Sequence, residues 1–140
     1  MRTGLSLGRD VPGMMSGMAY IAFEKKDYTT ALAYLDSIDA KESPWVHSER
    51  FFPLYAMGKT KEANHLLDSL RNTVGKHIPA VIGTCFAFKK SYDSAFMYFE
   101  LARKDSSAGL AFINLDRRIP ANFRKDSRYK ELVKFVGLEN

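Results

Sequence analysis

The chain has 140 residues, of which 46% are hydrophobic, and it contains ten Phe and seven Tyr. This composition excludes a disordered polypeptide, and the length suits one domain with a core of its own. The single cysteine, Cys85, excludes an internal disulfide, and no Cys/His cluster in the sequence predicts a zinc site. No apolar run approaches the roughly 20 residues of a membrane span. We therefore expect a cytoplasmic protein that does not enter a membrane.

The two ends of the chain differ from its middle. Residues 1–11, which contain Gly4 and Gly8, are interpreted as a leader or linker, and residues 12–140 as a single domain. The formal net charge is +5, and from Arg117 onward seven Lys/Arg stand against three Asp/Glu. Such an end can attract phosphate or acidic partners. We expect mainly a solvated helix face here, because acids are interleaved with these basic residues: Arg117, Arg118, Arg124, Lys125, Arg128 and Lys130.

One short sequence recurs along the chain. Lys25–Leu35 reads KKDYTTALAYL, Lys89–Phe99 reads KKSYDSAFMYF, and Met57–Leu67 is a weaker copy, MGKTKEANHLL. A period of 20 to 50 residues is the signature of stacked repeats. The alanine at the same place in each copy recurs every 32 residues, as Ala31, Ala63 and Ala95.

Apolar periodicity predicts two helices joined by a tight turn in each copy. In the first unit, about residues 12–42, one apolar stripe runs from Met14 to Phe23 and a second from Tyr28 to Ile38. Asp27 lies between them, and we predict that it is the N-cap of the second helix, accepting from the backbone N–H near Thr30.

The second and third units, about residues 43–74 and 77–107, follow the same plan. In the second, we predict helices over Pro44–Met57 and from Thr60 to about Leu70, with Gly58 ending the first. In the third, we predict a helix over Pro79–Phe88 and a second helix with Ser91 as its N-cap, with Gly75 breaking the chain before them. Residues 108–140, including Ala108–Leu115 and a final helix, would form a cap. The predicted fold is an all-α solenoid of helical hairpins with about three units.

These residues resemble the tetratricopeptide repeat family, whose pattern combines small residues with an aromatic and an alanine on the second helix. The resemblance covers about residues 12–107. The second unit is degenerate, with Phe51 at a small-residue position and Thr60 where an aromatic is usual, and the 32-residue step is two short of the family's 34. The matches in the third unit are Gly83, Phe86, Tyr92, Ala95, Phe99 and Ala102, and those in the first are Ala19, Ala22, Tyr28, Ala31, Leu35 and Ile38.

The last residues resemble the closing segment of tetratricopeptide regions in bacterial signalling proteins, although Ser127 replaces a proline. This resemblance implies that the chain is the C-terminal, partner-binding part of a larger regulator. The matching residues are Phe123, Arg124, Asp126, Arg128, Tyr129, Leu132, Gly137 and Leu138.

The sequence offers no constellation for catalysis. The three histidines, His47, His65 and His77, lie in different elements, and none is spaced for metal binding with another. Cys85 falls on the core side of a predicted helix, so we expect a buried small hydrophobe. The Gly-Lys-Thr at Gly58 lacks the first glycine of a phosphate loop. We predict a protein that is not an enzyme and binds neither cofactor nor metal.

The family resemblance implies a concave face built by the first helices. Exposed aromatics there would suit capture of a mainly apolar peptide or protein segment. The alternative is that these rings are buried by the terminal helix, the leader or a second copy. We expect partner contacts from Tyr20, Phe23, Trp45, Phe52, Tyr55, Thr84 and Phe88, on a face that also holds Gly13, Ser16, Ser48, His77, Ala80 and Ala87.

The sequence bears on three other classes of partner. Family members that bind the C-terminal carboxylate of chaperones use Lys, Asn and Arg, whereas the matching positions here offer no charged fork, which argues against a chaperone tail. Nucleic acid or an acidic partner could bind the basic C-terminal segment, with a steep dependence on salt. A homodimer could form if the groove or an uncapped end docks onto a second copy. The positions compared with the chaperone binders are Ser16, Tyr20, Phe52, Ala80 and Thr84.

Overall fold

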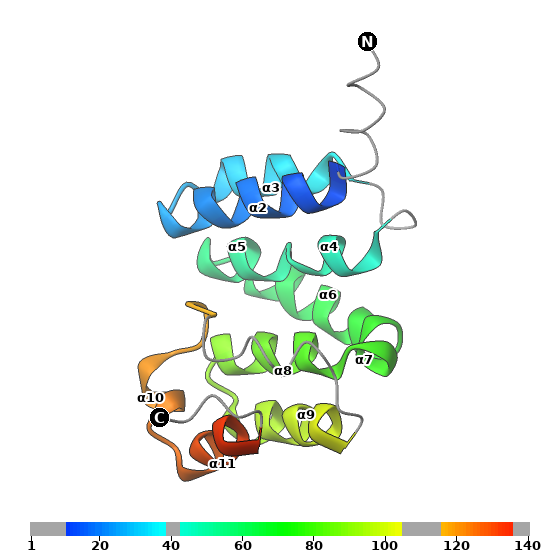
Figure 1. Cartoon of the computed structure of the whole chain (residues 1–140). Helices are drawn as coiled ribbons and strands as arrows, with labels where there is room; N and C mark the ends of the chain where they lie inside the picture. The colour runs from blue at the N-terminus through cyan, green and yellow to red at the C-terminus, as the bar shows by residue number, and fades with distance from the viewer. Residues whose placement is uncertain (1–10, 39–42, 105–115, 136–140) are drawn as a thin grey trace. The chain divides into compact units, whose positions relative to one another are not determined.

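The computed structural model describes residues 11–38, 43–104 and 116–135, without the side chains of residues 11, 12, 44 and 45. Every regular element in these ranges is a helix, which confirms the all-α class (Figure 1). The contacts divide the chain into two compact units, Met1–Leu66 and Leu67–Asn140, and each contains a core of its own. Most of the expected leader, and Ala108–Leu115 of the expected cap, lie outside the described residues.

The first unit is built on a helical hairpin. Helix α2 (Val11–Glu24) packs against α3 (Tyr28–Asp36), and the short helices α4 (Pro44–Ser48) and α5 (Phe51–Ala56) pack against α3 (Figure 1). The predicted N-cap is confirmed, since the Asp27 carboxylate accepts from the backbone N–H of Thr30 at 3.3 Å. The core residues are Ala19, Ala22, Ala31, Leu35, Ile38 and Val46.

The helix predicted over Pro44–Met57 is wrong in one respect, because it is interrupted between α4 and α5. Proline has no backbone N–H, and its ring clashes with the carbonyl four residues earlier in an α-helix. Pro53 therefore cannot continue the α-helical pattern to the carbonyl of Glu49, which instead accepts from the N–H of Phe52 at 3.3 Å. Pro53 was the signal in the sequence for this interruption.

Two residues at the interruption, Glu49 and Arg50, form side-chain hydrogen bonds to the first hairpin. The Ser16 hydroxyl on α2 donates to the Glu49 carboxylate at 2.8 Å. The guanidinium of Arg50 donates to the carboxylate of Asp36, just at the end of α3, at 2.7 Å. Both bonds tie the turn between α4 and α5 to the hairpin formed by α2 and α3.

The second unit contains the end of α6 (Thr60–Arg71), α7 (Val74–His77), α8 (Pro79–Phe88), α9 (Tyr92–Lys104), α10 (Ala121–Arg124) and α11 (Ser127–Phe135). Helices α8 and α9 form its main hairpin, at the bounds predicted for α8, and α11 packs against α9 (Figure 1). The ring of Phe123 lies between 4.3 and 5.8 Å from four other rings. Those rings belong to Tyr92, Phe96, Phe99 and Tyr129.

Gly75 has a different role from the predicted chain break. It lies inside α7 and is buried. A Cβ atom at this position would lie 3.0 Å from the side chain of Ile82 and 3.3 Å from the carbonyl of Leu70. The glycine therefore allows close packing at a place where a larger residue would push Ile82 aside, which the sequence alone does not reveal.

The turn between paired helices has the same geometry at three places. The backbone has positive φ at Lys26 (64°), Gly58 (88°) and Lys90 (66°), positions 32 residues apart. At each one the following N–H bonds to the carbonyl five residues before it, over 2.8 to 3.0 Å, which is the Schellman closure of a helix. The bonded pairs are Asp27 to Ala22, Lys59 to Leu54 and Ser91 to Phe86.

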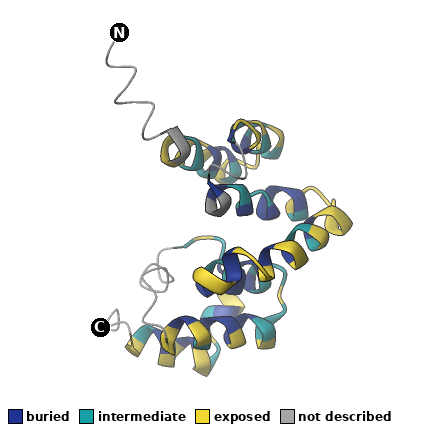
Figure 2. Cartoon of the chain, turned by 90° about the vertical axis from the view of Figure 1, so that its right-hand side faces the viewer, coloured by how far each residue is buried: buried dark blue, intermediate teal, exposed yellow. Residues whose placement is uncertain are grey.

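The matched alanines share one environment. Ala31 is 1% exposed, and Ala63 and Ala95 are 0% exposed. Figure 2 shows that several of the helices have one buried face and one exposed face. A residue no larger than alanine lets two helices approach closely at this point. The recurring alanine is thus a buried packing position in all three copies.

Candidate functional site

The aromatics predicted to line a groove in the first unit are less exposed than expected. Tyr20, Phe23 and Tyr55 are half-buried, whereas Phe52 is only 2% exposed. The Phe52 ring lies edge-on to Phe51 at 5.5 Å and to Phe23 at 6.5 Å. The expectation of an exposed Phe52 is therefore wrong, because this ring fills the core. The side chain of Trp45 lies outside the described residues.

The second unit contributes the other predicted groove residues. Thr84 and Phe88 on α8 are half-buried, and the Thr84 hydroxyl donates to the carbonyl of Ala80 at 2.9 Å. Ala80 and Ala87 are themselves buried, as is Ser48 of the first unit. The expected face is thus only partly accessible at these positions. Partner binding by the half-buried members stays a prediction.

Three arginines of the basic C-terminal segment, Arg118, Arg124 and Arg128, form contacts within the unit, whereas Arg117, Lys125 and Lys130 are exposed. Arg118 forms a two-pronged ion pair with Asp116, with both distances at 2.9 Å. The guanidinium of Arg124 donates to the backbone carbonyl of Asp116 and to the Tyr129 hydroxyl at 2.8 Å. Burial by itself would raise the pKa of the Asp116 carboxyl, but bonds from Arg118 and the charge of Arg124 bring that pKa below its usual value.

Arg128 is the most heavily engaged of these residues. Its guanidinium pairs with Asp93 on α9 at 3.0 Å and with Asp126 at 3.0 Å, and it lies 4.3 Å from the centre of the Phe96 ring. Hydrogen bonds from the Arg128 side chain and backbone hold the pKa of the Asp126 carboxyl below its usual value. The guanidinium groups of Arg118 and Arg128 are therefore paired with carboxylates, whereas in a nucleic-acid site they would bind phosphate groups.

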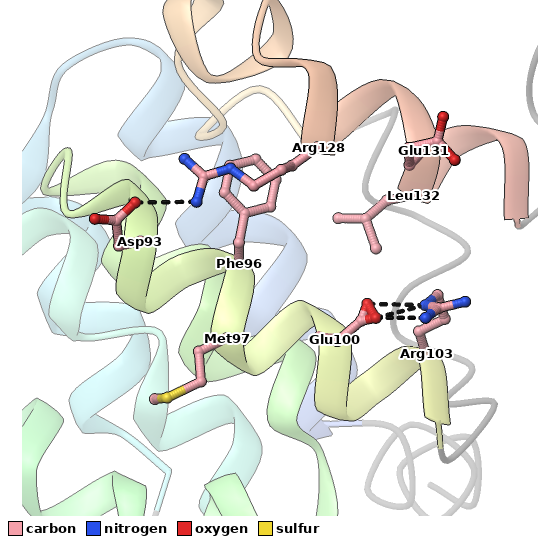
Figure 3. Close-up of a pocket in the computed structure, with 8 residues that line it drawn as sticks. All are labelled: Asp93, Phe96, Met97, Glu100, Arg103, Arg128, Glu131 and Leu132. Atoms are coloured by element: carbon pink, nitrogen blue, oxygen red, sulfur yellow. Dashed lines mark hydrogen bonds and ion pairs between the residues drawn. The ribbon is translucent and has the colours of Figure 1, made fainter.

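A groove between α9 and α11 was not predicted. It has a volume of about 540 Å³ and joins an apolar floor to charged walls (Figure 3). In Figure 3 the Asp93–Arg128 pair and the Glu100–Arg103 pair lie apart, with Phe96 between them. The only signal for this groove in the sequence was the spacing of three and four residues between its lining residues on α9. The other wall comes from α11, which is distant in the chain. The lining residues are Asp93, Phe96, Met97, Glu100, Arg103, Arg128, Glu131 and Leu132.

The residues weighed for catalysis do not converge. Cys85 is 0% exposed, as expected of a small core hydrophobe. His65 and His77 are exposed and His47 is half-buried. Within the described ranges, no three His, Cys, Asp or Glu side chains are grouped so that they could hold a metal ion. A search of the same ranges finds no helix with the length and hydrophobicity needed to cross a bilayer.

Comparison of the chain with protein-family models, with curated proteins and with solved structures finds no match. The resemblance to tetratricopeptide repeats therefore depends on the residues and turns described above. Function has to be argued from those same features.

Proposed function

We propose that this chain is a protein-interaction module built from tetratricopeptide-like helical hairpins, with about three repeats and a C-terminal cap. The observation that carries the proposal is the Schellman turn that recurs at Lys26, Gly58 and Lys90, each followed five residues later by a buried alanine. Hairpins that repeat in this way stack on their neighbours and offer extended surfaces to other proteins.

The proposed ligand is a mainly apolar peptide or protein segment. Half-buried aromatic residues, which stay partly accessible to solvent, support this ligand class because they offer apolar area with little side-chain entropy to lose. Tyr20, Phe23 and Tyr55 would provide such contacts in the first unit, and Phe88 in the second. The module would act in the cytoplasm as the non-catalytic, partner-binding part of a larger regulator.

The test is a pull-down from a lysate of the source cell. The wild-type chain would be compared with a Tyr20→Ala/Tyr55→Ala variant and with a control, Phe135→Ala, which removes a 48% exposed ring from α11. Circular dichroism would first establish that all three are equally helical. A partner retained by wild type and control but lost by the double variant supports the proposal. Equal capture by all three would refute the aromatic site.

A further inference from the structure

The outer face of α2 has an unusual exposed apolar stripe. Met14 and Met18 are each 40% exposed and Ile21 is 57% exposed. Their spacing of four and three residues places them on one side of the helix, with Gly17 between them. Val11–Phe23 contains no charged residue. Solvated helix faces normally carry charges, so this stripe has the character of an interface.

The second copy of the repeat shows what normally covers these positions. The residues 32 places after Met14 and Ile21 are Val46, which is 0% exposed, and Pro53, which is fully buried. They lie in α4 and α5, and both helices pack against α3, the second helix of the preceding hairpin. The positions of the stripe are therefore the ones that, in the second copy, pack against a helix of the neighbouring hairpin.

The third copy agrees with the second. The residues 64 places after Met18 and Ile21 are Ile82 and Cys85, and both are 0% exposed. Of the six equivalents in the later copies, four are buried and two, Arg50 and Ile78, are half-buried, whereas all three stripe residues of the first copy are exposed. Within the described part of the chain, the first hairpin has no preceding helix to cover them.

In the last hairpin, α10 and α11 cover part of α9 and leave Met97 (51% exposed) and Leu101 (45% exposed) as exposed apolar residues on that helix. Phe123, Tyr129 and Leu132, from α10 and α11, are buried in one cluster with Phe96 and Phe99 of α9. Head-to-tail extension by a second copy would have to displace α10 and α11 from this cluster, so it is disfavoured relative to pairing of two α2 faces. An assembly in which each copy uses the same face closes as a two-fold dimer.

We propose that two copies of this chain associate through α2, antiparallel about a two-fold axis near Gly17. The uncharged stripe produces no like-charge repulsion across such an axis. A Cβ built on Gly17 has no atom within 4 Å, and the absence of a side chain there lets two helices approach closely. The flexible side chains of Met14 and Met18 can adapt to the facing copy. Met14, Met18 and Ile21 are not among the aromatic positions of the proposed function, although one of those positions, Tyr20, follows Gly17 by three residues on the same helix.

The first experiment measures the oligomeric state of the full chain by sedimentation velocity from about 2 to 500 µM. One helix face per copy lies at the low end of interface sizes, so we expect a dissociation constant on the order of 10 µM. Ile21→Glu should raise that constant at least about 30-fold, because two carboxylates would enter the interface. The matched control, Met97→Glu, changes a 51% exposed residue on α9 and should leave it unchanged.

The second experiment places a thiol at the proposed axis. Oxidation of Gly17→Cys by diamide should join two copies through a disulfide, with the two thiols oxidised and diamide reduced. Cys85 is 0% exposed and should stay unreacted, while Ala33→Cys, on the exposed face of α3, should cross-link far more slowly. A monomer at 500 µM would overturn the proposal. So would equal effects of Ile21→Glu and Met97→Glu, or equal cross-linking at positions 17 and 33.

Discussion

Gly83 on α8 provides the sharpest test of how the third hairpin packs. A Cβ at this position would lie 2.9 Å from two atoms of the Phe99 ring and 3.0 Å from a third. Real Cβ atoms do not approach so closely, and Phe99, at 1% exposed, has little room to move. Gly83→Ala therefore forces a buried ring to shift within a packed core.

Two opposing effects decide the result. Alanine in a helix interior is favoured over glycine by about 0.5 to 1 kcal/mol. Overpacking of a core costs about 1 to 3 kcal/mol. We expect Gly83→Ala to lower the free energy of unfolding by about 1 kcal/mol. Gly17→Ala is the matched control, since its new methyl group meets nothing within 4 Å and should stabilise the monomer by about 0.5 kcal/mol.

The assay is urea unfolding followed by circular dichroism at about 2 µM, low enough to keep the chain monomeric if α2 mediates a weak dimer. Amide hydrogen exchange in α8 and α9 would assign the change to the second unit. A Gly83→Ala variant as stable as the wild type would show that Phe99 can move freely, which would refute the reasoning from close packing.

The first hairpin suggests a rescue. At the positions equivalent to Gly83 and Phe99 it has Ala19 and Leu35, which are both buried in one cluster. Phe99→Leu alone should cost about 1 to 2 kcal/mol through the cavity it leaves. In the double variant Gly83→Ala/Phe99→Leu the new methyl group fills part of that cavity. We expect a favourable coupling of at least about 1 kcal/mol relative to the sum of the single changes.

The remaining predictions concern the recurring turn, the buried alanine and one partly buried carboxylate. Lys90→Gly should stabilise the fold by about 0.5 to 1 kcal/mol because Lys90 has a φ of 66°, whereas Gly58→Ala, at a φ of 88°, should destabilise it by about 1 kcal/mol in the same urea assay. Ala95→Leu should cost more than 2 kcal/mol by separating α8 from α9, and a smaller loss would contradict its packing role. Asp116→Asn should cost about 1 to 2 kcal/mol at pH 7 by removing the pair with Arg118. The folded pKa of Asp116 lies below the unfolded value of about 3.9. The contribution of the Asp116 carboxylate to stability is therefore present above about pH 4 and is lost as the pH falls through the folded pKa. The free energy of unfolding of Asp116→Asn should thus decrease less steeply in acid than that of the wild type.

The sequence predicted the local structure well where one short segment decides it. The Asp27 cap, the glycine turn at Gly58 and the bounds of α8 each depend on a few neighbouring residues, and each is confirmed. Lys26 and Lys90 adopt the same turn without glycine. The repeat made these turns predictable, since their neighbours match those of Gly58 at a fixed spacing.

Prediction failed where distant segments decide the structure. Whether Phe52 lines a groove or fills a core depends on Phe23, which lies on another helix. The groove between α9 and α11 requires Arg128 to reach Asp93 across 35 residues of sequence. The buried environment of Gly75 requires Ile82 from the next helix. Periodicity specifies which face of a helix is apolar but not which neighbour covers it.

The repeat also explains why the exposed stripe on α2 is informative when exposed apolar residues elsewhere are not. An isolated exposed side chain such as Met97 has equivalents, Ala33 and His65, that are exposed as well, so the repeat gives no reason to expect a neighbour there. Exposed apolar surface of this kind is common in proteins. Ile21 has two equivalents, Pro53 and Cys85, and both are buried. The internal comparison thus identifies one face of α2 that lacks, among the described residues, the neighbour that covers its equivalents. In a chain with three copies of the same turn, each copy serves as a control for the others.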